Sequence, residues 1–448
     1  MTSADPMTSA DAMTSADSMT SVDLMASADP MASADPSPAA DLMASPEPIT
    51  SADPRPAAPP PTAAAGSTPA PTPTSTSAPA SVPGRPWALL AELTHACPLH
   101  CGYCSNPLEL TRRSLELTTE QWSDVMRQAG EFGVVHTHLS GGEPLLRRDL
   151  AEIVAAAEAA GIYTQLVTSG VGLDGARLSA LAAAGLRSVQ LSVQHADPRA
   201  SDRIAGRRSF ADKERAAALV RDAGLPLGLN VVLHRENLDA IDSLVELGLS
   251  WGVDRIELAN TQFYGWGLLN RAALLPTRDQ LARARDAVER WRERLTPNGP
   301  DLVWVVPDYF DGVAKPCMGG WGAVSLTVAP DGTVLPCPAA ASLPDLDPPN
   351  IRDHPLAWIW DHSGAFTRYR GTDWMPDPCR SCSRRDEDFG GCRCQAYALT
   401  GDATRTDPAC RLSPDHGLIR SLADDGREGR GVIRRRAPGR PEVVGRQP

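Results

Sequence analysis

Three cysteines in the sequence have the spacing of a metal-binding motif, Cys97-x3-Cys101-x2-Cys104. Thiolates are the ligands of iron–sulfur clusters, and they also bind zinc. Three thiolates on a cluster of four irons leave one iron open, and an open iron can bind a substrate. A zinc site would need a fourth ligand, which His95 or His100 could supply. This segment alone therefore leaves both an iron–sulfur cluster and a zinc site as interpretations.

A glycine motif follows the next strand that the sequence predicts, Ser140-Gly141-Gly142-Glu143-Pro144. Two adjacent glycines let the backbone approach a ligand closely, and Glu143 adds an acceptor for an ammonium group. Alone, such a motif could be an ordinary turn before a helix. Because it comes one strand–helix unit after the three cysteines, it favours the cluster with an open iron.

Together the two motifs resemble the radical S-adenosylmethionine superfamily. The resemblance implies that Cys97, Cys101 and Cys104 hold a [4Fe-4S] cluster whose open iron binds S-adenosylmethionine. It also implies that the motif Gly141, Gly142, Glu143 and Pro144 receives the amino group of this cofactor, and that Tyr103 lies near its adenine. In this family one electron from the cluster cleaves the sulfonium bond, and the resulting 5′-deoxyadenosyl radical removes an unactivated hydrogen.

The ends of later strands supply further candidate contacts. In this family Ser169, Ser192 and Gln194 would touch the methionyl and ribose parts of S-adenosylmethionine, although hydrogen bonding within loops is the alternative. Tyr264 and Trp266 either wall a substrate site or pack between two parts of the chain. His138 and His234 receive no functional role.

Seven cysteines remain in the second half of the chain, in a region with little regular periodicity. Their spacing resembles the SPASM extension, which houses auxiliary iron–sulfur clusters in radical enzymes that modify peptides. Two clusters with only protein ligands need eight ligands, and the family spacing places the eighth at Asp388. The resemblance implies two sets: Cys379, Cys382, Asp388 and Cys410, and Cys317, Cys337, Cys392 and Cys394. The alternatives are that Asp388 only caps a loop, that one iron position is unfilled, or that the region binds structural zinc.

Longer motifs resemble one family more closely, the peptide cyclases of pyrroloquinoline quinone (PQQ) biosynthesis. These motifs are Ala91-Glu92-Leu93-Thr94, Gln262-Phe263-Tyr264-Gly265-Trp266, Cys317-Met318-Gly319-Gly320-Trp321-Gly322 and Asp388-Phe389-Gly390-Gly391-Cys392-Arg393-Cys394. The resemblance extends from about Trp87 to Ser413. It implies a radical S-adenosylmethionine oxidoreductase that joins the Glu γ-carbon to the Tyr ring of the PQQ precursor peptide, the first step of that pathway.

The same resemblance implies the partners of the enzyme. A separate small peptide-chaperone protein would present the precursor, an electron donor such as flavodoxin or ferredoxin would reduce the first cluster, and the auxiliary clusters could accept the electron released from the peptide. Two other functions stay open. One is another peptide maturase of the SPASM type, thioether-forming or sulfatase-activating. The other is an iron–sulfur electron carrier, although a carrier has no need for the glycine motif.

The fold that must position these residues is α/β. Apolar runs alternate with amphipathic segments of 10–15 residues, which indicates strand–helix–strand units and a parallel sheet. The predicted strands are 87–93, 134–139, 163–168, 189–193, 227–233 and 255–259, and residues 324–335 suggest a hairpin. A doubly wound sheet and a partial barrel both fit this pattern; the resemblance implies a partial (β/α)6 TIM-type barrel followed by a cysteine-rich, loop-rich extension. In either case ligands bind at the carboxyl ends of the strands.

The composition, the change of pattern near residue 300 and the resemblance together divide the chain into four predicted regions. Residues 1–86 contain a Met-Thr-Ser-Ala-Asp-Pro-like repeat and no Cys, Trp, Tyr or Phe, so we expect this segment to be disordered. Residues 87–300 form the predicted barrel, residues 301–413 the auxiliary-cluster region, and residues 414–448 a largely disordered, solvated tail.

Charge and hydropathy exclude several classes of function. The net charge is −12, of which −7 falls in residues 1–86, so the remainder offers no large basic field for a nucleic acid. No apolar run is long enough to cross a membrane, and the N-terminus lacks the features of a secretory signal. We therefore expect a cytoplasmic protein that binds neither nucleic acid nor membrane, in which disulfides do not account for the ten cysteines.

Overall fold

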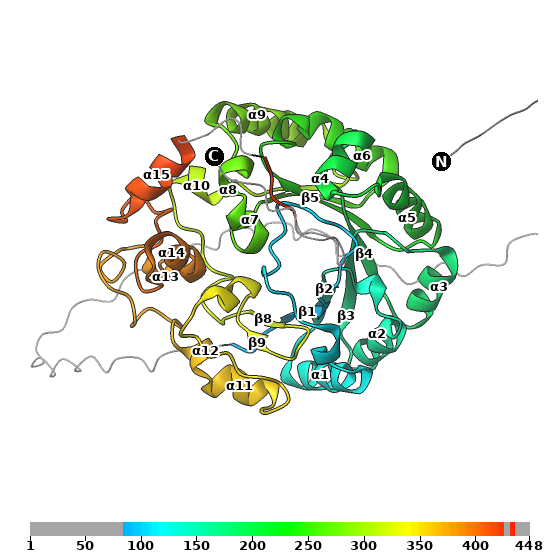
Figure 1. The fold of residues 1–448 in the computed structure, drawn as a ribbon, viewed down its shortest axis with the longest axis horizontal. Helices are drawn as coiled ribbons and strands as arrows, with labels where there is room; N and C mark the ends of the chain where they lie inside the picture. Colours follow the sequence, from blue (N-terminus) through cyan, green and yellow to red (C-terminus); the bar gives the residue numbers. More distant parts are fainter. Residues whose placement is uncertain (1–83, 425–430, 435–448) are drawn as a thin grey trace, which may run out of the picture. The chain divides into compact units, whose positions relative to one another are not determined.

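A sheet of nine strands organises the part of the chain that the computed structural model describes, residues 84–424 and 431–434 (Figure 1). The strand order is β7-β6-β5-β4-β3-β2-β1-β8-β9. The strands are β1 (Ala88–Thr94), β2 (His136–Gly141), β3 (Tyr163–Thr168), β4 (Ser188–Ser192), β5 (Leu227–Leu233), β6 (Arg255–Asn260), β7 (Asp301–Trp304), β8 (Ser325–Val328) and β9 (Val334–Leu335). All neighbours from β7 to β8 pair in parallel, and only β9 runs antiparallel to its neighbour β8. The predictions for residues 1–83, 425–430 and 435–448 lie outside the described residues.

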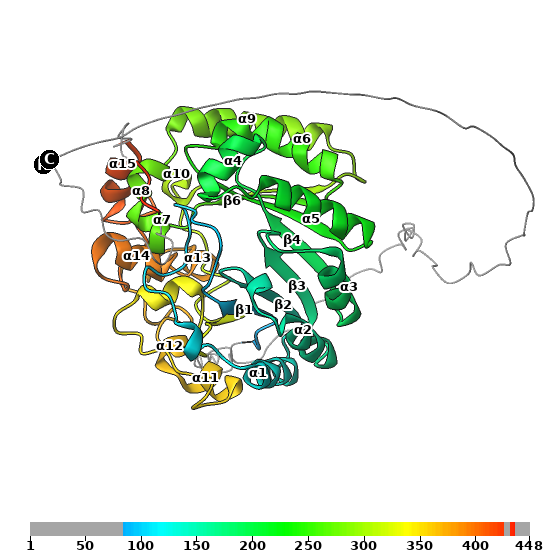
Figure 2. The ribbon, with the colours of Figure 1, turned by 45° about the vertical axis from the view of Figure 1, so that its right-hand side comes forward.

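Helices connect consecutive strands from β1 to β8, and most of those in the barrel cover the outer face of the curved sheet (Figures 1 and 2). Those of the barrel are α1 (Thr119–Phe132), α2 (Leu150–Ala159), α3 (Gly175–Ala183), α4 (Pro198–Ala205), α5 (Phe210–Asp222), α6 (Ile241–Trp251), α7 (Gly265–Leu269), α8 (Arg271–Leu274) and α9 (Arg278–Arg294). Those that follow are α10 (Asp308–Asp311), α11 (Leu356–His362), α12 (Gly364–Thr367), α13 (Arg385–Asp388), α14 (Arg393–Thr400) and α15 (His416–Asp424). Within the described ranges, no helix combines the length and the apolar character needed to cross a membrane.

The predicted α/β fold, a partial barrel followed by a cysteine-rich extension, is confirmed, and the six predicted strands correspond to β1 to β6. The predicted boundary at residue 300, however, is not a break in the sheet. β7 and β8 lie beyond it and pair with β6 and β1, at opposite ends of the predicted six strands. One apolar core runs through both parts, because Leu326 of β8 and Trp360 of α11 belong to the same buried cluster as the barrel residues.

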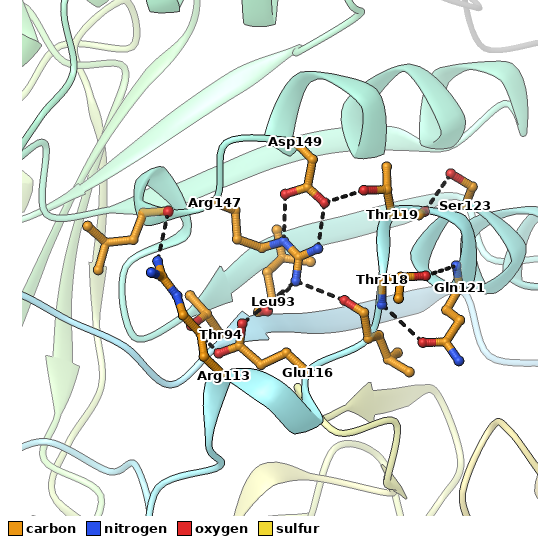
Figure 3. A network of polar contacts seen from close by, with 12 residues as sticks. Leu93, Thr94, Arg113, Glu116, Thr118, Thr119, Gln121, Ser123, Arg147 and Asp149 are labelled. Atoms are coloured by element: carbon orange, nitrogen blue, oxygen red, sulfur yellow. Dashed lines mark hydrogen bonds and ion pairs between the residues drawn. The ribbon is translucent and has the colours of Figure 1, made fainter.

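A largely buried arginine side chain links the end of β1 to the start of α2 (Figure 3). Arg147 Nη1 donates to the carbonyls of Leu93 (3.2 Å) and Leu117 (3.0 Å), and its guanidinium pairs with Asp149 at 2.6 Å. Asp149 in turn accepts a hydrogen bond from the hydroxyl of Thr119 in α1 (2.6 Å). Since β1 leads directly into the cysteine loop and α2 follows the glycine motif, Arg147 fixes the two motifs relative to each other.

The prediction of a largely disordered tail from residue 414 is wrong for residues 416–424, which form α15. Ile419 is 1% exposed and packs in a small apolar cluster with Leu275, Tyr309 and Ala409. The residues rich in Gly, Arg and Pro begin only after this helix. The prediction treated residues 414–448 as one region and so overlooked the apolar pattern of residues 416–424.

Residues 431–434 lie against the cysteine loop. Asn270 Nδ2 donates to the carbonyls of Gly102 (2.8 Å) and Ile433 (2.7 Å), and Asn270 Oδ1 accepts from the Ile433 amide (2.7 Å). Arg434 donates to the carbonyl of Ile204 (2.7 Å). This segment therefore packs on the loop that carries the first three cysteines, instead of extending into solvent.

Replacing Ile419 by Ala should lower the free energy of unfolding by about 2–4 kcal/mol, because a buried side chain is removed from a packed cluster. Leu418→Ala is the matched control on the same helix, since Leu418 is 41% exposed and should change stability by less than about 1 kcal/mol. Anaerobic denaturant titration measures both values. Equal effects of the two substitutions would contradict the packing of α15.

Candidate active site

A cavity of about 240 Å³ opens at the carboxyl ends of the parallel strands, as the fold class predicts. Its wall contains residues from the ends of β1 to β6, or from the loops that follow them. The lining residues include Cys97, His100, Cys101, Tyr103, Cys104, Asn106, Ser140, Gly141, Gly142, Thr168, Ser169, Ser192, Gln194, Val232, Asn260, Gln262 and Trp266. The structure thus brings both sequence motifs and all three candidate residues from β3 and β4 to one site.

The three cysteines lie on one side of this cavity. Burial raises the pKa of the Cys97 thiol to about 12, and it also raises the pKa of Cys101. Burial thus favours the neutral thiols when no cation is bound, and a bound metal would have to displace their protons. His95, a candidate fourth zinc ligand, does not line the cavity; its Nδ1 accepts a hydrogen bond from the Thr111 amide (3.1 Å).

A single metal ion has no ready-made site here: within the described ranges, no group of three His, Cys, Asp or Glu side chains is placed to hold one ion. A four-iron cluster is wider than one ion, and its thiolate ligands stand farther apart. An independent sign of a missing ligand is Gln194 Oε1, which is buried and has no hydrogen-bond partner among the described residues. Three thiols and an unpaired acceptor in one cavity fit a cluster with a polar organic cofactor.

The two motif glycines are required by close contacts within the chain. A Cβ at Gly141 would collide with the backbone of Thr94, and a Cβ at Gly142 would collide with the backbone of Ala96. The Gly142 amide donates to Thr94 O (2.5 Å), and the Glu143 amide donates to Ala96 O (2.8 Å). The motif therefore joins the end of β2 to the residues directly before Cys97, and it reaches the cavity wall as a consequence.

Glu143 does not lie on the cavity wall, where the sequence predicted it as a contact to the cofactor. Its carboxylate is 0% exposed and does not line the cavity, and neither does Pro144. It accepts hydrogen bonds from the Leu145 amide (3.1 Å), the Thr168 hydroxyl (2.6 Å), and the amide (2.8 Å) and hydroxyl of Ser169. With four donors on two oxygens, Glu143 holds the end of β3 in place, and Ser169 and Thr168 face the cavity instead.

Tyr103 also lines the cavity and has two polar neighbours there. Gln194 Nε2 donates to the Tyr103 hydroxyl (2.9 Å) and to Ser192 Oγ (3.2 Å). The ring of Tyr103 lies 5.3 Å from the ring of His234, which is buried and whose pKa falls to about 3 because of that burial. His234, to which the sequence analysis assigned no role, is thus a neutral imidazole that packs against the ring of Tyr103.

Trp266 and Tyr264, considered together in the sequence, separate in the structure. Trp266 lines the cavity, whereas Tyr264 does not. Tyr264 lies near the thiols of Cys337 and Cys394, and burial raises its pKa, so it packs between the barrel and the cysteine-rich region. Thr168, Asn260 and Gln262 also line the cavity and were not predicted as site residues, although Thr168 ends a predicted strand and the other two follow one.

Four of the remaining thiols form one compact set. The Cys317 thiol interacts with the thiols of Cys337 and Cys392, and the Cys394 thiol interacts with the same two. The pKa of Cys337 lies well below its usual value because its sulfur interacts with Cys317 and Cys394. The structure therefore brings together the four cysteines that the resemblance assigned to one auxiliary site.

The other four candidate ligands line a second small cavity of about 20 Å³. They are Cys379, Cys382, Asp388 and Cys410. The Cys379 thiol is 3.1 Å from the Thr406 hydroxyl, and Asp388 Oδ1 accepts a hydrogen bond from the Gly390 amide (2.9 Å). Asp388 thus both caps its loop and faces the three thiols, so its role as a ligand stays a prediction.

Replacing Glu143 by Gln should weaken the binding of S-adenosylmethionine about tenfold, because an amide nitrogen cannot accept the hydrogen bonds that order Ser169. Equilibrium binding to the reconstituted protein measures the effect, and Glu120→Gln, on the exposed first turn of α1, is the control. Unchanged affinity in the Glu143 variant would show that the carboxylate does not organise the site.

Solved structures share this fold at low sequence identity. SuiB of Streptococcus suis bound to S-adenosylmethionine matches with a TM-score of 0.62 and 20% identity, over 73% of this chain and 78% of that one. The same protein bound to the precursor peptide SuiA matches with a TM-score of 0.63 and 20% identity, over 73% and 76%. A structure of anSMEcpe with bound AdoMet matches with a TM-score of 0.53 and 17% identity, over 76% and 96%.

Comparisons at the level of sequence identify the family. The family model of the radical SAM superfamily matches residues 91–248, and that of the SPASM iron–sulfur cluster-binding domain matches residues 317–383. A protein named PqqA peptide cyclase from Streptomyces rochei is 57% identical over 336 residues, which is 75% of this chain and 92% of that one. Proteins of the same name from Methylocella silvestris and Gluconobacter oxydans are 53% and 50% identical, over 75% and 77% of this chain and 91% and 96% of theirs. The chain belongs to the PqqA peptide cyclases, a family of radical S-adenosylmethionine enzymes with a SPASM domain.

Proposed function

We propose that this enzyme joins the γ-carbon of a Glu to the ring of a Tyr in the PQQ precursor peptide. The observation that carries the proposal is the convergence of three cysteines, the glycine motif and the polar ends of β3 and β4 on one cavity. The identity to PqqA peptide cyclases over most of their length supports the choice of substrate. The reaction removes two hydrogen atoms from the peptide as the carbon–carbon bond forms.

The proposed cofactors are S-adenosylmethionine, one [4Fe-4S] cluster on Cys97, Cys101 and Cys104, and two auxiliary iron–sulfur clusters. When bound, the first cluster and S-adenosylmethionine supply a radical that can take hydrogen from an unactivated carbon. The residues of the chain hold the cofactor in a defined position. Ser169 is fixed by Glu143, and Tyr103 is fixed by Gln194 and His234, so both present defined groups to the cofactor.

A peptide substrate fits the surroundings of the cavity. The cavity reaches Asn260, Gln262 and Trp266, which stand beyond the strands that would hold the cofactor, and Trp266 offers an aromatic surface to a bound side chain. The structures of SuiB with SuiA and of anSMEcpe with a peptide show that related folds bind peptides. We further propose that a separate chaperone protein presents the precursor and that a flavodoxin or ferredoxin supplies the electron.

Mass spectrometry tests the function. The reconstituted protein, incubated anaerobically with S-adenosylmethionine, a reductant, the precursor peptide and its chaperone, should yield a peptide lighter by two hydrogen atoms. Fragmentation should locate the link between Glu and Tyr, and a precursor with Phe in place of this Tyr serves as a substrate control. A variant with Cys97, Cys101 and Cys104 replaced by Ala should keep the auxiliary clusters and form neither product nor 5′-deoxyadenosine. A thioether link, or 5′-deoxyadenosine from this variant, would contradict the proposal.

Asp388 provides a test of the proposed auxiliary ligands. A carboxylate is a harder ligand than a thiolate and donates less charge to iron, so Asp388→Cys should shift the reduction potential of one auxiliary cluster. Electron paramagnetic resonance during a redox titration measures this shift, with the first cluster as the internal reference. Asp386→Cys is the control, because Asp386 is exposed on the same short helix, α13. If Asp388→Cys and Asp388→Ala both leave all potentials unchanged, Asp388 is not a ligand and an unfilled iron position is the better account.

A further inference from the structure

Two helices hold the cysteine loop, residues 97–104, which carries its three thiols into the cavity. The His100 amide donates to the carbonyl of Ala205 at the end of α4 (2.8 Å). The Gly267 amide of α7 donates to the carbonyl of Cys104 (2.9 Å). Between these two anchors the loop has a stretch that neither helix backbone fixes by such a bond.

A third anchor lies near the far end of the chain, in residues 431–434, which we call the strap. Figure 1 shows this short segment in red beside the loop that follows β1. Asn270, which is 4% exposed, joins the strap to the loop. Its Nδ2 donates to the carbonyls of Gly102 (2.8 Å) and Ile433 (2.7 Å), and its Oδ1 accepts from the Ile433 amide (2.7 Å). Two of these three bonds depend on the strap, and a buried amide that loses its partners is destabilising.

The side chains of the strap alternate between the protein and solvent. Val432 and Arg434 are partly buried, whereas Ile433 is 54% exposed. Arg434 Nη1 donates to the carbonyl of Ile204 in α4 (2.7 Å) and lies 3.4 Å from the carbonyl of His100 in the cysteine loop. The guanidinium therefore joins the loop to α4, close to the bond between the His100 amide and that helix.

The cysteine loop has a glycine at the point where the strap lies closest. A Cβ at Gly102 would lie 2.1 Å from Cγ1 of Val432, whereas its next neighbours would be at 3.5 Å, an ordinary contact distance. The φ of Gly102 is outside the left-handed region, so the backbone conformation does not require glycine here. The missing side chain instead makes room for Val432, and the two positions are complementary.

The strap contacts the loop away from the cavity. The cavity wall includes Cys101 and Tyr103 but neither Gly102, which lies between them, nor any residue of the strap. The strap therefore leaves the cavity open to a cofactor and a substrate while it covers the loop from another side.

We propose that the strap is a positioning element for the first cluster, which holds the cysteine loop in its cluster-binding arrangement and shields it from solvent. This role rests on the proposed function, because it requires a cluster on the first three cysteines. Val432 and Arg434 are positioning residues, since they act through the loop. A loop held at fewer points opens more often, and each opening exposes its cluster ligands to water.

The first test compares two substitutions in the strap of the anaerobically reconstituted full chain. Arg434→Met removes the bonds to the loop and to α4, and Ile433→Ala is the matched control because it shortens an exposed side chain of the same segment. Two rates are measured: hydrogen exchange of the amides of residues 97–104, and release of iron from each cluster to an added chelator, followed by electron paramagnetic resonance.

We expect Arg434→Met to accelerate both rates about tenfold at the cysteine loop, as for the loss of about 1.4 kcal/mol of hydrogen bonding. Iron release from the auxiliary clusters should keep its wild-type rate, and Ile433→Ala should match the wild type in every measurement.

The second test is a rescue that depends on the contact between Gly102 and Val432. Gly102→Ala should displace the strap and accelerate both rates at least as much as Arg434→Met. Val432→Ala removes Cγ1, the atom that meets the new Cβ, so the double variant should return close to the rates of Val432→Ala alone. Gly102→Ala combined with Ile433→Ala should show no such rescue.

Three results would overturn the proposal. The first is unchanged loop exchange and iron release in both Arg434→Met and Gly102→Ala. The second is additive effects of Gly102→Ala and Val432→Ala, because a contact between the two positions requires compensation. The third is an equal acceleration at the auxiliary clusters, which would indicate general destabilisation. Absence of the first cluster in the wild type would contradict the proposed function instead, and the exchange and rescue measurements report on the strap without it.

Discussion

Burial of charge is the constraint on which the rest of this structure depends. Four charged side chains in the described ranges are fully buried: Glu143, Lys213, Arg393 and Asp407. Glu143 and Lys213 lie at the first cysteine site. Arg393 and Asp407 lie at the auxiliary sites, where Asp407 accepts a hydrogen bond from the Cys392 amide (2.8 Å) and Arg393 donates to the carbonyls of Ala403 and Arg405. Because a buried charge without a partner is costly, each of these side chains is held by hydrogen bonds from or to neighbouring groups, and these bonds fix the segments around the cysteines.

The strands of the sheet hold these buried charged groups in place. At the first site the buried groups are held by strand ends: Glu143 by β3, and Lys213 by β3 and β4. The parallel sheet also continues into the cysteine-rich region, because β8 pairs with β1, the strand that leads into the cysteine loop. Tyr264 packs between the two regions. The first site and the auxiliary sites are thereby built on one continuous framework, not on two independent domains.

The sequence was sufficient for those parts of the site that depend on local pattern. Cys97, the glycine motif and the six parallel strands were predicted from spacing and periodicity, since each signal lies within a few residues. The role of Glu143 was not predicted from the sequence. It depends on hydrogen bonds from Thr168 and Ser169, which lie 25 and 26 residues away in sequence. Lys213 was missed for a similar reason: a lysine in a helix is expected to face solvent, and only the tertiary fold places it beneath the cavity.

The most direct test of the account is whether S-adenosylmethionine binds to an iron of the first cluster. Reduced protein would be mixed with cofactor carrying 15N in its amino group and 17O in its carboxylate, and examined by electron–nuclear double resonance. The account predicts hyperfine coupling of both labels to one cluster, and loss of this coupling when Cys97, Cys101 and Cys104 are replaced by Ala. Coupling to an auxiliary cluster, or no coupling in protein that carries the first cluster, would contradict it.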